Sequence, residues 1–166
     1  MIKRLNDQMA IHLKNLNYDA LTTDYALPTD LVTLLESPIV ECNGCFLLSS
    51  CRDSAPEGMN DFDKTVYEDF ENHFHPDAYL ERDAQADIEY LKLGLESAKR
   101  LAARLKQIQS TRFTVCLVYS ETEREGDIVA VYGSSTVRFY ALRPGVKMGV
   151  DDLNSYESEA VLEMDA

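Results

Sequence analysis

The chain has 166 residues, of which 45% are hydrophobic and 27% are charged, and its formal net charge is −13. These proportions argue against a disordered chain, and the length allows a core that needs neither disulfides nor metal for stability. Nucleic acids and anionic membranes are bound through positive surfaces, so the charge disfavours both as partners.

The sequence has no apolar run long enough for a transmembrane helix, and the N-terminal stretch MIKRLNDQMAIHLK lacks the apolar centre of a secretory signal. We therefore expect a cytoplasmic protein with no membrane partner. In that compartment its four cysteines, Cys42, Cys45, Cys51 and Cys116, are expected to be reduced thiols.

Two helices are predicted before any strand. Apolar residues recur at three- and four-residue steps from Ile2 to Leu16, which predicts an amphipathic helix over about residues 3–17. A short leucine-bearing helix is predicted to begin near Asp30, after the extended Leu27-Pro28 entry, and to stop before the next proline.

Two β-rich runs, residues 39–42 and 45–49, are separated by Asn43-Gly44. This pair readily takes the positive φ values of a two-residue type I′ turn, so the segment predicts a β-hairpin. Cys42 and Cys45 would then face each other across the turn. Redox-active pairs usually lie at a helix N-terminus, where the helix dipole lowers a thiol pKa, and no helical pattern begins here.

A helical pattern returns at Asp61 and ends near His75-Pro76. Phe62, Val66 and Phe70 recur at four-residue steps, and the acidic residues occupy the remaining surface.

The longest helical pattern covers about residues 78–109. Gly94 interrupts it, and because a glycine inside a helix costs about 1 kcal/mol relative to alanine, it marks either close packing or a break. The apolar stripe is short and has alanines at its centre. We therefore expect it to pack on the protein's own sheet rather than in a coiled-coil dimer, in a monomer or weak dimer.

The last third changes to a strand pattern. Valine, tyrosine and phenylalanine are frequent in residues 113–119, 128–132 and 136–142, which predicts an antiparallel three-strand meander, with a short turn or helix over 151–157 and a terminal strand over 160–164. The whole chain, residues 1–166, is predicted to be a single α+β domain. Its antiparallel sheet, built from the N-terminal hairpin and the C-terminal meander, packs against the long central helix and shorter helices.

Metal binding is an alternative that the sequence leaves open. Cys42 and Cys45 supply two thiolate ligands, which zinc prefers, and Cys51, His73 or His75 could complete a tetrahedral site. On a helix, residues two positions apart point away from each other. If Phe74 instead lies in an extended stretch, both imidazoles share a side and the site becomes possible. We expect no metal or other cofactor, and we keep a small Cys/His metal- or thiol-dependent protein as the first alternative.

Recognisable catalytic motifs are absent from the sequence. It has no glycine-rich phosphate loop, no HExxH and no dinucleotide fingerprint, and Gly133-Ser134-Ser135 lies between predicted strands rather than at the strand-to-helix elbow of esterases. A non-enzymatic role is therefore favoured, and an enzyme with an unmarked carboxylate site is the second alternative.

The negative charge is concentrated in residues 15–98, which contain 18 acidic and four basic residues together with five tyrosines. Carboxylates steer a cationic partner and tyrosines provide anchoring contacts, so the main hypothesis is a binding protein for a basic protein partner. Its most specific form is an inhibitor or immunity-type protein that covers the positively charged site of a nuclease or other toxin. The candidate partner-binding residues are Asp61, Asp63, Tyr67, Glu68, Asp69, Glu71, Tyr79, Glu81, Asp83 and Asp87.

One short motif resembles a known group. Leu27-Pro28-x-Asp30 followed by a leucine-rich helix is similar to the opening of SMI1/KNR4-like proteins, many of which are toxin-immunity proteins. The glycine-rich continuation common in that group is replaced here by Ser37-Pro38 and the cysteine hairpin. The resemblance implies the same type of function as the charge pattern.

Overall fold

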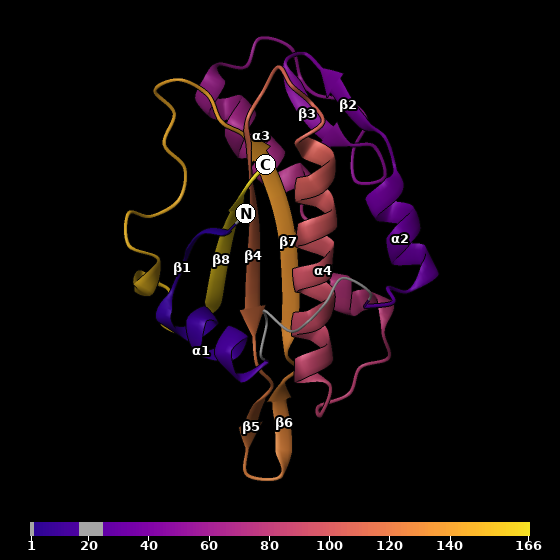
Figure 1. Ribbon diagram of the computed structural model, residues 1–166, viewed down its shortest axis with the longest axis vertical. Helices are drawn as coiled ribbons and strands as arrows, with labels where there is room; N and C mark the ends of the chain where they lie inside the picture. The colour runs from indigo at the N-terminus through magenta and orange to yellow at the C-terminus, as the bar shows by residue number, and fades with distance from the viewer. Residues whose placement is uncertain (1, 17–24) are drawn as a thin grey trace.

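The computed structural model describes residues 2–16 and 25–166, and it confirms the α+β class (Figure 1). Its elements in chain order are β1 (Ile2–Leu5), α1 (Asp7–Asn15), α2 (Thr29–Glu36), β2 (Ile39–Cys42), β3 (Cys45–Leu48), α3 (Asp61–Glu71), the 3-10 helix η2 (Pro76–Tyr79), α4 (Asp87–Leu105), β4 (Phe113–Ser120), β5 (Glu123–Glu125), β6 (Ile128–Val131), β7 (Ser134–Ala141), the 3-10 helix η3 (Leu153–Ser155) and β8 (Ala160–Asp165).

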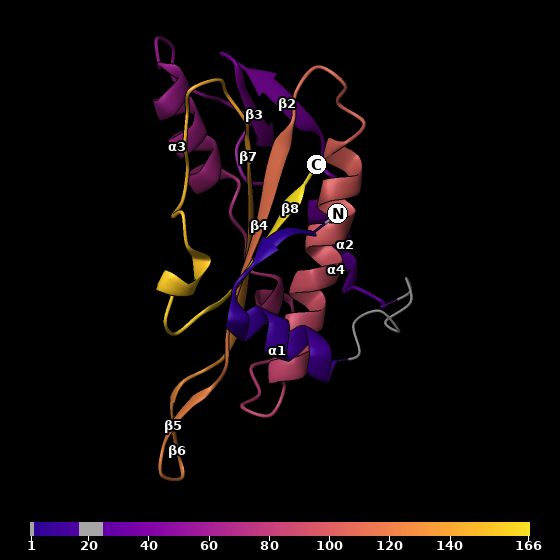
Figure 2. The same ribbon diagram turned by 60° about the vertical axis from the view of Figure 1, so that its left-hand side comes forward.

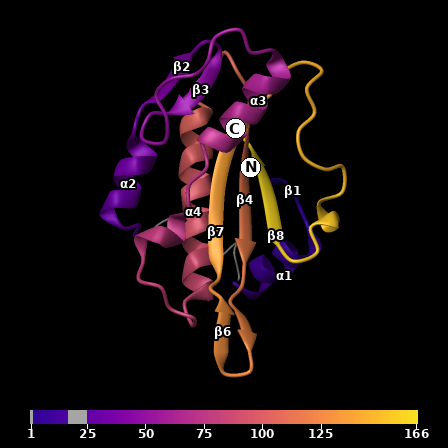
Figure 3. The same ribbon diagram turned by 180° about the vertical axis from the view of Figure 1, so that it is seen from behind.

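The main core lies between a four-stranded antiparallel sheet, ordered β1-β8-β4-β7, and the helices α1 and α4 on one of its faces. Helix α3 and the segment 142–159 lie on the other side of the sheet, as Figure 2 shows. In the view from behind, α3 crosses one end of the sheet and β2 and β3 lie beside it (Figure 3). None of the helices within residues 2–16 and 25–166 is long and apolar enough to span a membrane.

The predicted hairpin around Asn43-Gly44 is confirmed. β2 and β3 pair antiparallel, with Cys42 opposite Cys45, and the turn residues have positive φ values of 50° and 76°. This hairpin forms a sheet of its own rather than part of the main sheet. The short helix α2, the helical turn η3 and the terminal strand β8 also form where the sequence pattern places them.

The predicted helix over about residues 3–17 is wrong at its start. The first four described residues form β1, an edge strand that pairs antiparallel with β8. Asn6 ends the strand and caps α1, because its side-chain oxygen accepts hydrogen bonds from the Met9 N–H (3.0 Å) and the Val161 N–H (3.0 Å). β1 is a strand because it pairs with β8, and pairing with a segment so distant in the sequence leaves no signal in the local pattern. The last residue of that prediction lies outside the described residues.

The predicted three-strand meander is also wrong. β4 pairs with β7 along its whole length, from Phe113 opposite Ala141 to Ser120 opposite Ser134. β5 and β6 continue this long hairpin as a separate two-stranded extension that projects from the body of the protein (Figure 1). Ile128, in the extension, is 72% exposed. The β-branched residues of β6 correctly indicate a strand. The preference of such residues for strands does not reveal whether a given strand joins the core.

The long central helix is shorter than the predicted 78–109, because residues 78–86 and 106–109 are not part of α4. The Tyr90 hydroxyl accepts a hydrogen bond from the Asp83 N–H (2.8 Å) and donates one to the Asp83 carbonyl (3.1 Å). The Asp83 carboxylate accepts a hydrogen bond from the Gln85 N–H (2.9 Å). These contacts satisfy backbone groups that a helix would otherwise pair, so the segment before α4 folds as a turn.

Helix α4 packs against β4 and β7 of the same chain, as predicted, and Gly94 lies at a point of very close approach. A Cβ atom at this position would be 2.7 Å from Leu117 Cδ1 and 3.0 Å from Ser135 Cβ. Both distances are shorter than ordinary van der Waals contact. The glycine therefore marks close packing rather than a break in the helix.

We predict that Gly94→Ala destabilises the protein. Alanine gains about 1 kcal/mol of helix propensity, but overpacking against the buried Leu117 costs about 1–3 kcal/mol, so a net loss is expected. Urea unfolding followed by circular dichroism measures the difference. Ala103→Gly, at an exposed position of the same helix, should cost about 1 kcal/mol through propensity alone. A Gly94→Ala protein more stable than the wild type would contradict the close packing.

Candidate functional site

The residues that helix α3 buries are polar, and its large apolar side chains are exposed. Thr65 and Glu68 are buried, and so is Asn72, which follows the last turn. The sequence pattern placed Glu68 on the surface among the partner-binding residues. That assignment is wrong, because its side chain is fully buried.

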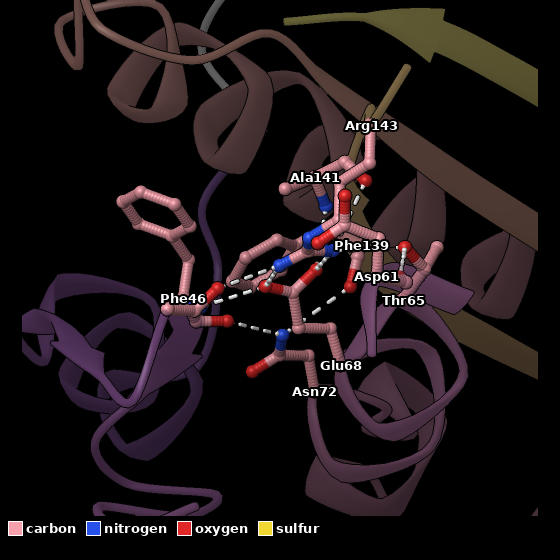
Figure 4. A network of polar contacts seen from close by, with 9 residues as sticks. Phe46, Asp61, Thr65, Glu68, Asn72, Phe139, Ala141 and Arg143 are labelled. Atoms are coloured by element: carbon pink, nitrogen blue, oxygen red, sulfur yellow. Dashed lines mark hydrogen bonds and ion pairs between the residues drawn. The ribbon is translucent and has the colours of Figure 1, made fainter. Parts of the chain in front are cut away.

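Glu68 forms a complete set of hydrogen bonds beneath α3 (Figure 4). Its carboxylate accepts from the Phe46 N–H of β3 (2.8 Å) and the Ala141 N–H of β7 (2.8 Å). Both of its oxygens also accept from the Arg143 guanidinium, at 2.6 and 2.9 Å. The guanidinium neutralises the buried charge and also donates a hydrogen bond to the Gly44 carbonyl (2.8 Å).

Asn72 extends this network by one turn. Its side-chain oxygen accepts from the Leu48 N–H (2.9 Å). Its amide donates to the Phe46 carbonyl (2.9 Å) and the Phe139 carbonyl (3.3 Å) (Figure 4). Strands β3 and β7 are at the edges of different sheets, so these backbone groups have no strand partner on this side. The inner face of α3 therefore has to be polar.

The outer face of α3 carries three large apolar side chains in a row. Phe62 is 54% exposed, Val66 is 41% exposed and Phe70 is 67% exposed. Their four-residue spacing places them on one side of the helix. We call these three residues the α3 stripe. It was visible in the sequence as a helical repeat, but such a repeat is normally the buried face, so the sequence could not identify it as a surface.

Several predicted partner-binding residues lie around the α3 stripe. Asp61 and Asp63 are exposed in the first turn of α3, and Glu71 is partly exposed in its last turn. Tyr67 is partly exposed, and its hydroxyl donates to the Ser54 carbonyl (2.9 Å).

Asp69 is held by an ion pair within the protein. Its carboxylate is 3.4 Å from Arg138 Nη1, and burial raises its pKa although the neighbouring guanidinium acts in the opposite direction. Asp69 is therefore part of the contact between α3 and the sheet rather than a freely available surface charge.

The other predicted partner-binding residues lie at the end of η2, in the segment after it and at the start of α4, which begins at the end of the sheet away from α3 (Figure 1). Glu81 and Asp83 are exposed there, whereas Tyr79 packs against the core. Asp87 accepts hydrogen bonds from the Thr122 N–H and hydroxyl, the latter at 2.6 Å. The predicted acidic surface is thus divided into two regions, and the region on α3 adjoins the α3 stripe.

Four of the candidate metal ligands form two separate pairs. Cys42 and Cys45 are opposed in the hairpin, and the rings of His73 and His75 are 5.7 Å apart in an edge-to-face contact. Within residues 2–16 and 25–166, no group of three or more His, Cys, Asp and Glu side chains is arranged to hold a metal ion.

The chain matches the Uncharacterized protein PM0498 family over residues 4–166, which is nearly its whole length. No curated protein and no solved structure matches it.

We predict that Glu68→Gln strongly destabilises the fold. The substitution keeps the shape of the side chain but replaces an accepting oxygen with an NH₂ group that faces other donors, and it leaves Arg143 uncompensated. Breaking one side of such a buried ion pair costs about 3–5 kcal/mol. Urea unfolding measures the loss. Glu71→Gln, a partly exposed position on the same helix, should change stability by no more than about 0.5 kcal/mol. Equal unfolding midpoints for wild type and Glu68→Gln would contradict the proposed role.

We also predict that one cysteine reacts much faster than the other three. Burial raises the pKa of Cys45 and Cys51, and it raises the pKa of Cys116 to about 11, so each holds little reactive thiolate at pH 8. Cys42 is partly exposed. A titration with 5,5′-dithiobis(2-nitrobenzoate) should give one fast equivalent that Cys42→Ser removes, and four equivalents after unfolding. Two or more fast thiols would disagree with this arrangement.

Proposed function

The chain belongs to the Uncharacterized protein PM0498 family, and we propose that this member is a non-enzymatic binding protein that holds a basic protein partner on the outer face of α3. The observation that carries the proposal is that α3 buries polar side chains and exposes its large apolar ones. A helix whose apolar side chains point to solvent has a surface suited to another protein.

The α3 stripe has the spacing of a helical recognition surface. Residues at positions i, i+4 and i+8 line up along a helix, and such anchors are a common way for a helix to engage a groove. Large aromatic side chains contribute most of the binding energy in many interfaces. Phe62 and Phe70 are the natural anchors, because each exposes more than half of its surface, at 54% and 67%.

The charge around the α3 stripe indicates the chemistry of the partner. Helix α3 contains five acidic residues and only one basic residue, Lys64, in a protein whose net charge is −13. After Glu68 and Asp69 are engaged inside the protein, Asp61, Asp63 and Glu71 still border the stripe. Carboxylates around apolar anchors favour a partner with a basic rim, because opposite charges speed the encounter.

The most specific form of the proposal is an inhibitor or immunity-type protein. Nucleases that act on polyanionic nucleic acid have a positively charged site, and an acidic protein can cover that site by presenting a similar charge. In this form the α3 stripe and its carboxylates would occlude the basic site of a nuclease or other toxin. The proposal includes a cytoplasmic location, where reduced cysteines are stable.

Site-directed photocrosslinking tests the proposal. A benzophenone amino acid replaces Phe70, and the labelled protein is crosslinked in an extract of its native host at low salt. We expect a basic protein to be captured, and then to bind the purified wild type with an association rate that falls steeply as salt rises. With that purified partner, Phe70→Ser should weaken binding at least about tenfold, a loss typical of an interface anchor. Asp63→Lys should mainly slow association.

Matched variants at distant positions provide the controls. Ile88→Ser removes an apolar side chain that is 55% exposed on α4, and Asp127→Lys changes an exposed charge in the turn between β5 and β6. Both should bind like the wild type. Capture of no basic protein, or equal weakening by Phe70→Ser and Ile88→Ser, would count against α3 as the docking surface.

A further inference from the structure

The face of the main sheet that points away from α4 is largely polar. Cys116 of β4 lies between Arg138 of β7 and Glu163 of β8 in the strand register, and Arg4 of β1 lies opposite Glu163. Asp69 of α3 completes this row through its ion pair with Arg138. One row across the sheet therefore contains two cations and two carboxylates, where a soluble sheet covered by protein would normally be apolar.

Unpaired polar atoms gather on the same face. Of the four buried side-chain atoms without a hydrogen-bond partner among residues 2–16 and 25–166, three belong to it: Thr114 Oγ1, Arg138 Nε and Asp165 Oδ1. The nearest cation to Asp165 Oδ1 is Lys3 Nζ at 3.8 Å, too far for a hydrogen bond. Native proteins leave few such atoms unpaired, and water or a ligand commonly completes them.

Two cavities lie between this face and the segment 142–159. Their volumes are about 300 and 160 Å³. They share Tyr140, Met148 and Glu163 in their linings, so we treat them as one trough. A ligand site of a few hundred Å³ is a normal size for a small molecule.

The covering segment is tied to the N-terminal residues from Val150 onward. Arg4 donates to the Val150 carbonyl (3.0 Å), and Asn6 donates to the Glu159 carbonyl (2.7 Å). Gly145 and Gly149 both have φ values of 75° and border the stretch over the larger cavity. This stretch carries Val146, Lys147 and Met148, which provides an apolar wall beside a cation.

The lining of the larger cavity is rich in basic side chains, in an otherwise acidic protein. Four basic residues and two acidic residues line it. Arg4 and Arg143 are committed to bidentate ion pairs with buried carboxylates. Lys3 lies 3.8 Å from the carboxylate of the partly exposed Asp165, and Lys147 is paired with the exposed Asp151. Exposed ion pairs contribute little, so both lysines can exchange their partners for a ligand at small cost.

We propose that the trough binds a small amphipathic organic anion, a carboxylate or sulfonate on an apolar body. Lys3 and Lys147 hold the anionic group, and the apolar body lies against Val146 and Met148. Arg138, whose Nε is unpaired and which lines the smaller cavity, adds a donor to the polar contacts, directly or through water. This site is separate from the α3 stripe and does not depend on the function proposed for it.

Fluorescence titration with 8-anilinonaphthalene-1-sulfonate, an amphipathic anion, tests this inference on the full chain. We expect one saturable site. Lys147→Glu should weaken binding at least fivefold, and so should replacing the probe by N-phenyl-1-naphthylamine, which lacks the sulfonate. Lys106→Glu changes the same charge at an exposed position outside the trough and should leave the affinity within twofold of the wild type.

A second measurement locates the probe. With ¹³C-methyl methionine, the probe should shift the Met148 signal more than that of Met9, which is buried in the main core. Phe70→Ser should bind the probe as the wild type does. The proposal would be overturned by absence of saturable binding or by unchanged affinity in Lys147→Glu. Loss of binding in Phe70→Ser would also overturn it, because the probe would then be bound at the α3 stripe.

Discussion

The ion pair between Glu68 and Arg143 is the interaction on which the arrangement of this protein depends. A single carboxylate binds backbone N–H groups from the edges of two different sheets, and a guanidinium balances its charge in a buried position. Strand β3 and strand β7 do not pair with each other, so the side chains of α3 supply what a ladder of strand hydrogen bonds would otherwise supply. Without this network, the β2–β3 hairpin would have an unpaired polar edge facing the protein.

The surface of α3 is a consequence of that network. Once Glu68 and Asn72 must face inward, the geometry of the helix turns Phe62 and Phe70 outward, whatever their preference for the core. The cost is exposure of apolar area to water. A binding partner that covers the α3 stripe would remove this apolar area from water. In this way the buried ion pair of the fold is linked to the function we propose.

The two faces of the main sheet have different chemistry for a related reason. The face under α4 is apolar, and the packing is so close that Gly94 has no room for a side chain. The other face is covered by α3 and by the irregular segment 142–159, and its apolar cluster is small, consisting of Cys116, Leu153 and Val161. Charged pairs such as Arg4 with Glu163 hold the N- and C-terminal strands together there, and space remains between them and the segment above.

The sequence by itself determined the α+β class, the Asn43-Gly44 hairpin and most of the helices, because these depend on preferences between residues one to four positions apart. It also located the acidic segment that contains α3. Tertiary structure alone decided that β1 joins β8, that β4 joins β7 directly, and that α3 buries its polar face. Glu68 binds a backbone group 73 positions away. A local pattern shows that a helix has two faces, but only the distant groups that need hydrogen bonds determine which of them is inside.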